Sequence, residues 1–164
     1  MKKTIIGVMG PGEKARPEDI TNAFKLGKLI AEKDWILLSG GRNAGVMDAV
    51  NKGAKSAGGL TIGILPSCDG SDVSDFVDIS IITGMGSARN NINVLSSRVV
   101  VACGAMEAGT LSEIALALKA QKQVILLNDD AEGQQFIKRV CKEKVHIANT
   151  PEAAVGLIQK LTLT

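Results

Sequence analysis

Short apolar runs alternate with amphipathic stretches along the whole chain. The apolar runs are continuous, without a polar residue at every second position. That pattern is typical of parallel strands that helices cover on both faces. We expect strands at residues 4–9, 35–39, 60–65, 79–82, 98–103, 123–127 and 145–148.

The stretches between these runs predict helices. In residues 17–33 apolar side chains recur near the helical period, and Pro17 suits a first helical position. A helix over residues 44–57 is followed by Gly58, a common helix terminator. The remaining helices are expected at residues 87–97, 110–121, 131–142 and 151–161, the last with Thr150 as its N-cap.

Strand–helix alternation predicts a Rossmann-like α/β fold. We expect a doubly wound, mostly parallel sheet of about seven strands with helices on both faces. The 164 residues, 45% of them hydrophobic, suit a single domain spanning 1–164, and with 2% aromatic residues its core is aliphatic. Ligands of such sheets bind outside the carboxyl ends of the strands, so the loops that follow the strands are the candidate site.

Composition narrows the partners and the compartment. A net charge of +2 and scarce aromatic residues favour neither nucleic acid nor a membrane as partner. Three cysteines without a C-x-x-C pair indicate a reduced, cytoplasmic protein with no disulfide framework and no metal site. The first apolar run ends at Gly10, too early for a signal peptide, and is interpreted as a core strand.

Two glycine-bearing loops follow the first two strands. The first carries Gly10 and Gly12 and is either a simple turn or part of a ligand site. The second carries Gly40, Gly41, Arg42 and Gly45. It matches the dinucleotide fingerprint only loosely, so a phosphate at the helix N-terminus is the better interpretation. Arg42 is either a ligand contact or a solvated charge.

A third loop carries Ser87, Arg89 and Asn90. Ser87 is the expected helix N-cap, and the planar guanidinium of Arg89 suits a phosphate. The alternative is an arginine on a solvated helix face.

A fourth loop, after residues 98–103, carries Gly104, Gly109, Thr110 and Glu113. A glycine-rich turn that opens a helix is a ready anion site, because free amides and the helix dipole point at the ligand. The alternative is a capping box, in which Thr110 caps the helix and Glu113 bonds back to the cap amide. A functional carboxylate is preferable only where Arg89 and a ligand lie close to Glu113.

Other polar residues are less informative. His146, the only histidine, is interpreted as structural. Cys103 is interpreted as a core residue, and the alternative is a thiol that faces a pocket. The aspartates of residues 67–78 lack the spacing of a calcium loop and predict a solvated surface loop.

Several ordered motifs, spread over residues 4–128, resemble one known family. They are Gly40-Gly41, residues 45–50, Gly58-Gly59, residues 63–66, Arg89 and residues 109–113. Together they are similar to the SLOG superfamily, which includes the Lonely Guy proteins, long labelled lysine decarboxylases. Residues 84–90 and 109–119 look most like the molybdenum-cofactor carriers of that superfamily.

The resemblance implies a cytoplasmic protein that binds a pterin–phosphate ligand, the molybdenum cofactor, or a nucleotide, without transforming it. The phosphate would be held by amides of Gly109 and Thr110 and of the loop 41–45, helped by Ser87, Arg89 and Asn90. No cofactor would be required for chemistry. The resemblance also implies a homodimer or homotetramer, with residues 87–97 as an interface element.

The alternative implied by the same resemblance is a nucleoside 5′-monophosphate phosphoribohydrolase of the Lonely Guy type. In that case Arg89 and Glu113 would be catalytic. Two departures count against it, because Asn90 stands where those enzymes have lysine and residues 104–108 replace their compact double-glycine turn. No lysine suggests a Schiff base, so true lysine decarboxylation is not expected. A degenerate member that acts as an interaction protein is a third interpretation.

Overall fold

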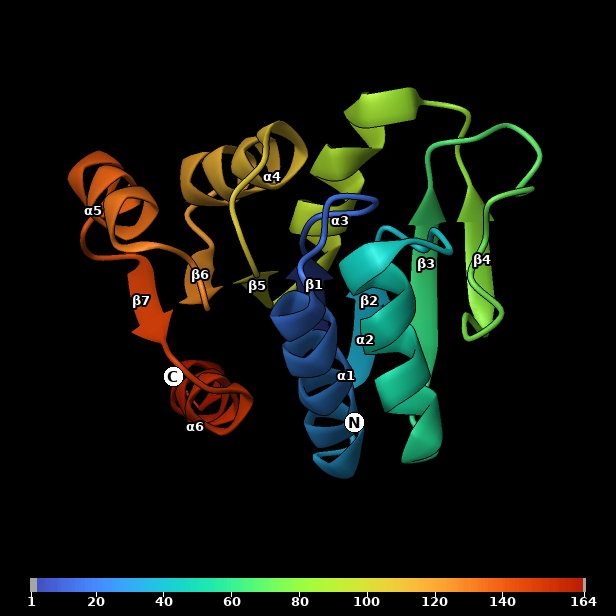
Figure 1. Ribbon diagram of the computed structural model, residues 1–164, viewed down its shortest axis with the longest axis horizontal. Helices are drawn as coiled ribbons and strands as arrows, with labels where there is room; N and C mark the ends of the chain where they lie inside the picture. The colour runs from blue at the N-terminus through green and yellow to red at the C-terminus, as the bar shows by residue number, and fades with distance from the viewer. Residues whose placement is uncertain (1–2, 164) are drawn as a thin grey trace.

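The computed structural model describes residues 3–163, and residues 1, 2 and 164 lie outside that description. One parallel sheet runs through it in the order β4-β3-β2-β1-β5-β6-β7 (Figure 1). Its strands are β1 (Ile5–Met9), β2 (Ile36–Ser39), β3 (Thr61–Leu65), β4 (Ile79–Ile82), β5 (Val99–Cys103), β6 (Gln123–Leu127) and β7 (Val145–Ala148). The predicted Rossmann-like class is confirmed, and each expected strand forms within a residue of its predicted bounds.

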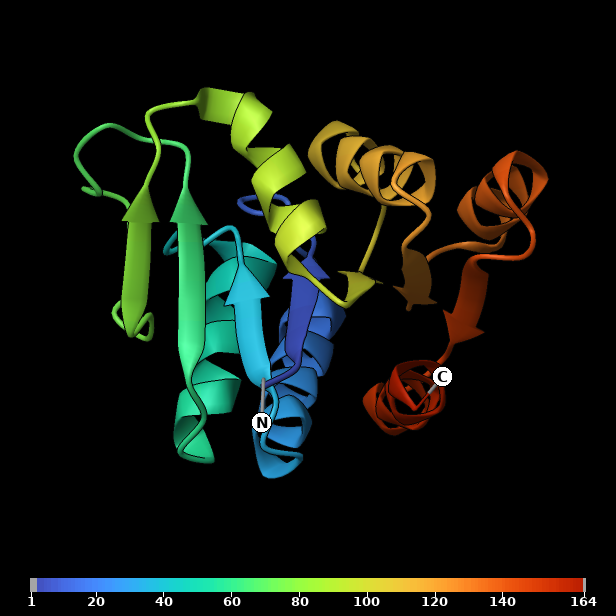
Figure 2. The same ribbon diagram turned by 180° about the vertical axis from the view of Figure 1, so that it is seen from behind.

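Helices cover both faces of the sheet (Figures 1 and 2). One layer consists of α1 (Pro17–Glu32), α2 (Gly45–Ser56) and α6 (Pro151–Thr162). The other consists of α3 (Asn90–Ser96), α4 (Ala108–Lys119) and α5 (Ala131–Val140), with a 3₁₀ turn η1 (Gly86–Arg89) leading into α3. Within residues 3–163, every helix is too short or too polar to cross a bilayer.

The core is aliphatic, as the composition predicts. Alternate residues of each central strand face opposite helix layers, so β1 contributes Ile6 and Val8 to one cluster and Met9 to the other. Burial on both faces explains why the central strands are uninterrupted apolar runs.

Two predicted helix starts are wrong. Ser87 is not an N-cap: it lies inside η1, whose N-cap residue is Met85, and its side chain makes no capping bond. The capping box of Thr110 and Glu113, the alternative interpretation of this loop, is also absent. Helix α4 begins at Ala108 with Glu107 as its N-cap residue, so Thr110 is already in the first turn. Extending α4 backwards moves the hydroxyl of Thr110 away from the cap position and leaves it for other partners.

The connectivity of the sheet creates a crevice beside β1. The chain runs outward from β1 through β2 and β3 to β4, then crosses over to β5 on the other side of β1. The loops after β1 and β5 therefore leave in opposite directions, and a doubly wound sheet binds ligands at this switch point.

Candidate functional site

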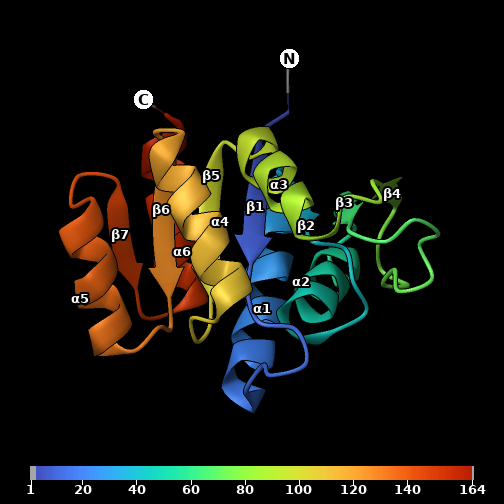
Figure 3. The same cartoon turned by 90° about the horizontal axis from the view of Figure 1, so that it is seen from above.

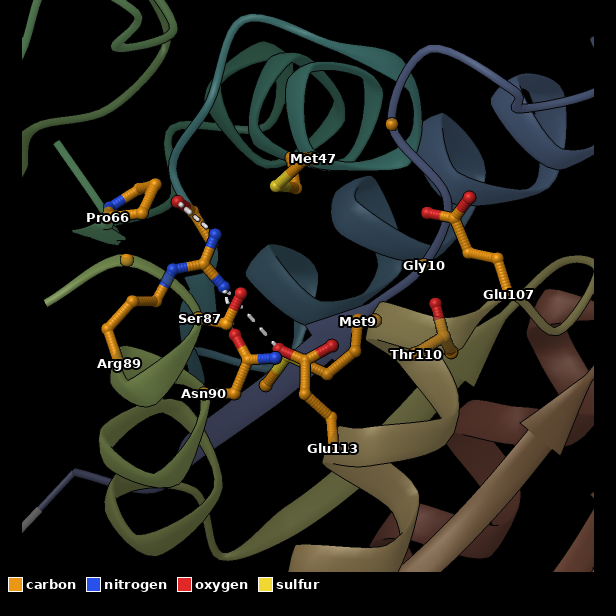
Figure 4. Close-up of a pocket in the computed structure, with 14 residues that line it drawn as sticks. Met9, Gly10, Met47, Pro66, Ser87, Arg89, Asn90, Glu107, Thr110 and Glu113 are labelled. Atoms are coloured by element: carbon orange, nitrogen blue, oxygen red, sulfur yellow. Dashed lines mark hydrogen bonds and ion pairs between the residues drawn. The ribbon is translucent and has the colours of Figure 1, made fainter.

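A pocket of about 270 Å³ opens at the carboxyl edge of the sheet, beside this switch point (Figure 4). Its size suits one heterocycle with a small substituent, since it falls just below the lower end of usual ligand cavities, about 300 Å³. The structure brings nine of the predicted residues to its wall: Gly10, Gly12, Gly40, Ser87, Arg89, Asn90, Gly109, Thr110 and Glu113.

Arg89 is the buried cation of the pocket, with its side chain 10% exposed. Its Nη1 donates to Oδ1 of Asn90 at 2.6 Å, and its Nη2 donates to the carbonyl of Gly40 at 3.5 Å. Its Nε is buried and has no partner among the described residues. Burial lowers the pKa of Arg89, but a guanidinium still keeps its charge at neutral pH. A buried positive group with an unused N–H is the donor that an anion satisfies.

Glu113 approaches Arg89 from the neighbouring helix, because α3 and α4 lie side by side (Figures 2 and 3). Its Oε1 accepts a hydrogen bond from Nδ2 of Asn93 at 2.9 Å and lies 3.6 Å from Nη1 of Arg89. Burial raises the pKa of Glu113 to about 7, against the opposing effects of Asn93 and Arg89. The loose ion pair therefore leaves Arg89 open to a ligand.

Asn90 ties the two helices together. Its Nδ2 donates to Oγ of Ser112 at 2.9 Å, and that hydroxyl donates to the carbonyl of Gly109 at 2.7 Å. Both ends of the Asn90 amide are thus engaged within the protein, one with Arg89 and one with Ser112. Asn90 therefore fixes the position of the guanidinium and supplies no charge of its own.

The N-terminus of α4 is the second polar element of the pocket. The first turn of a helix leaves its amides without intrahelical partners, and Gly109 and Thr110 lie in this turn. Thr110 is 2% exposed as a whole residue, and its Oγ1 is buried with no hydrogen-bond partner in the described chain. An unpartnered buried hydroxyl in a pocket wall is costly unless a ligand or water bonds it.

Two predicted residues of the second loop do not line the pocket. Arg42 turns away, donating from Nη2 to Oε1 of Glu13 at 2.6 Å and from Nε to Oδ2 of Asp72 at 3.0 Å. Gly41 packs against the next strand, where an added Cβ would lie 2.8 Å from the Cα of Gly63. Its amide is already bonded to Oγ of Ser39, so it has none left for a phosphate.

Gly45 and Gly104 are also outside the wall, for packing reasons. A Cβ on Gly45 would lie 2.4 Å from the carbonyl of Pro11, and the amide of Val46 donates to that carbonyl at 2.9 Å. The N-terminus of α2 is thus blocked by the first loop. Gly104 has φ +96 and packs against Asp19, while its own amide donates to Leu127.

Sequence reasoning missed five residues of the wall: Met9, Met47, Pro66, Gly86 and Glu107. Met9 and Met47 belong to β1 and α2, where an apolar side chain is indistinguishable from core by pattern. Glu107 is the one of these residues that the sequence could have indicated as part of the site. A carboxylate beside an anion-binding loop is unfavourable unless a hydrogen-bond donor pairs with it.

Three further expectations concern residues outside the pocket. Cys103 faces the α1 layer, with its Sγ near the carbonyl of Asp19, and burial raises the pKa of its thiol to about 12. Nε2 of His146 pairs with Oε1 of Gln123 at 2.8 Å, consistent with a structural role. In the described part of the chain, acidic, cysteine and histidine residues form no cluster suited to a metal ion.

Comparison with known proteins identifies the family. The sequence model of the SLOG cluster4 family matches residues 3–155. The chain belongs to the SLOG cluster4 family. An uncharacterized protein of Archaeoglobus fulgidus is 45% identical over 160 residues, 95% of each chain.

Two similar solved structures agree with the predicted resemblance. The molybdenum cofactor binding protein of Rippkaea orientalis is 59% identical, with a TM-score of 0.97 over 99% of both chains. The molybdenum cofactor carrier protein of Chlamydomonas reinhardtii is 49% identical, with a TM-score of 0.94 over 99% of this chain and 100% of that one. The chain is therefore similar to a molybdenum cofactor binding protein and a molybdenum cofactor carrier protein, as the motifs at residues 84–90 and 109–119 predict.

Proposed function

We propose that this single-domain chain is a cytoplasmic carrier that binds the molybdenum cofactor, a phosphorylated pterin, without transforming it. The observation that carries the proposal is the similarity, over essentially the whole chain, to a molybdenum cofactor binding protein and a molybdenum cofactor carrier protein. The pocket supports it independently, because the buried Nε of Arg89 and Oγ1 of Thr110 both lack partners within the described residues.

The phosphate would lie at Arg89 and accept hydrogen bonds from its guanidinium. The hydroxyl of Thr110 and the free amides around Gly109, on the first turn of α4, would bind polar groups of the ligand farther from Arg89. The hydroxyl of Ser87, exposed on η1, lies on the same wall. Asn90 contributes by holding Arg89 in place.

The test is cofactor retention. The protein is purified from cells that make the molybdenum cofactor, and molybdenum and pterin fluorescence are measured per chain. We expect both to co-purify with the wild-type protein and to fall when Arg89 is replaced by lysine, which keeps the charge but loses the planar fork. Absence of both from the wild-type protein would refute the proposal.

Hydrolysis of nucleoside monophosphates is the less favoured use of the same pocket. Arg89 and Glu113 do meet in the wall, but Asn90 supplies an engaged amide and no second cation. We expect no free base when the protein is incubated with AMP, GMP or CMP. Base release that disappears in Glu113→Gln would instead establish the enzyme.

We propose in addition that the chain forms a homodimer or homotetramer, with β4 as an interface element besides the one expected at residues 87–97. This strand pairs only with β3 in the described sheet, and Ile79, Ile81 and Ile82 are each more than 40% exposed. A second copy of the same strand would satisfy the open backbone edge and cover these side chains.

A further inference from the structure

A carboxylate without a partner stands at one end of the pocket. Glu107 is the N-cap residue of α4, with extended backbone, and its side chain makes no capping bond. It is half-buried and lines the pocket. Among residues 3–163 no hydrogen bond or ion pair is formed by its side chain, so its two oxygens are available to a ligand.

The pocket carries opposite charges at its two ends. Figure 4 places Glu107 on the opposite side of the pocket from Arg89, with its carboxylate directed toward the loop that carries Gly10. An anionic group of a ligand is attracted to the guanidinium and repelled by Glu107. The two charges therefore set one orientation, with the phosphate at Arg89 and the other end of the ligand at Glu107.

The middle of the pocket suits a flat ring. Met9 and Met47 lie between the two charged ends (Figure 4), and both are buried, at 2% and 8% exposure. Thioethers are polarizable and pack well against heteroaromatic rings. Gly40 allows this arrangement, because a Cβ there would lie 2.7 Å from the sulfur of Met47 and 2.8 Å from Nη2 of Arg89.

A carboxylate accepts hydrogen bonds only, and its two oxygens match two adjacent N–H donors. A ring N–H beside an exocyclic amino group provides that pair. The 2-amino-4-oxopyrimidine edge shared by pterins and guanine has it. Lumazine and hypoxanthine lack the amino group, and adenine presents a ring acceptor instead of the ring N–H.

We propose that Glu107 is the specificity-determining residue of the pocket and reads the 2-amino-4-oxopyrimidine edge of the bound heterocycle. The proposal rests on the proposed function, which places a phosphorylated heterocycle in this pocket. A site built to accept from an N–H rejects the analogue without it, because the carboxylate is then desolvated without a donor.

The experiment compares matched ligands by isothermal titration calorimetry. The probes are 6-hydroxymethylpterin phosphate and its lumazine counterpart, with GMP and IMP as a second matched pair. We expect wild-type protein to bind the pterin at least about tenfold more tightly than the lumazine, and GMP more tightly than IMP. Glu107→Gln should bring both affinity ratios close to one, because the glutamine side chain places an N–H donor against the amino group of the ligand, which is also a donor.

Glu132→Gln is the matched control, since Glu132 also lies at the start of a helix but is exposed on α5. It should keep the wild-type ratios, and thermal melts check that both variants fold. A wild-type ratio near one, failure of both pterin and GMP to bind, or an unchanged ratio in Glu107→Gln would each overturn the proposal.

Measuring cofactor retention distinguishes failure of the proposed role of Glu107 from failure of the proposed function. Wild-type protein that retains molybdenum but does not discriminate the probes refutes the role of Glu107 alone. Protein that discriminates the probes but never retains molybdenum keeps the role of Glu107 and refutes the carrier.

Discussion

Oε1 of Glu113 lies 3.6 Å from Nη1 of Arg89, beyond hydrogen-bond distance, while the same oxygen accepts a 2.9 Å bond from Asn93. The carboxyl is held by a neutral amide and only weakly balanced by the cation. This is why burial outweighs the charge of Arg89 and raises the pKa of Glu113 to about 7.

We expect this buried carboxyl to make stability depend on pH. Its pKa in the folded state is above the ordinary 4.5, so between pH 4.5 and 7 the folded chain keeps a proton that the unfolded chain has lost. Stability from this group is present below pH 4.5 and is lost as pH rises through 7, by an amount on the order of 3 kcal/mol.

Glu113→Gln should remove that loss. Urea unfolding at pH 5 and pH 8 measures it, with Glu132→Gln as the exposed control. The variant should gain stability relative to wild type at pH 8 compared with pH 5. If the difference between the two proteins is the same at both values, the carboxyl does not titrate in this range.

Gly104 and Gly109 flank the same loop but should respond differently to alanine. Gly104 has φ +96, and a Cβ would lie 2.6 Å from Cγ of the buried Asp19. We expect Gly104→Ala to lower the free energy of unfolding by about 2–4 kcal/mol. Gly109 is helical with nothing within 4 Å of a Cβ, so Gly109→Ala should be neutral or stabilising by up to about 1 kcal/mol. Denaturant titration compares them, and equal losses would refute this account of the loop.

Substitutions of Arg42 and Arg89, the two arginines predicted from the sequence to contact a ligand, should have different effects on ligand affinity. Arg42 bonds Glu13 and Asp72 outside the pocket, so Arg42→Ala should leave affinity for 6-hydroxymethylpterin phosphate within about twofold. Its partly exposed ion pairs should contribute no more than about 1 kcal/mol of stability. Arg89→Lys should weaken binding by about tenfold or more, because the fork is lost. Comparable loss in Arg42→Ala would place the anion at the second loop instead.

The exposed isoleucines of β4 should hold copies of the chain together. We expect light scattering after size exclusion to report a dimer or tetramer for wild type and a shift toward monomer for Ile81→Asp. Val140 is 60% exposed on α5, at the other end of the sheet, and Val140→Asp should leave the mass unchanged. A monomeric wild type, or a mass insensitive to Ile81→Asp, would rule out this interface.

Local pattern sufficed for most of the fold. Continuous apolar runs identified the strands, Thr150 capped α6 as expected, and Gly58 ended α2 in a left-handed conformation. These features depend on residues close together in the chain, and for that reason the sequence predicts them well. The start of α4 was misplaced because a threonine followed by a glutamate three residues later matches a capping box whether or not a cap forms.

The sequence by itself determined the fold class, the family and the loops of the candidate site, since each rests on short-range pattern or ordered motifs. Only the tertiary structure decided which loop residues line the candidate pocket. Arg42 and Arg89 look alike as loop arginines, yet one is engaged by Glu13 and Asp72 and the other is buried at the pocket. The difference arises from partners on other elements, which pairing across the sheet brings together and spacing along the chain does not encode.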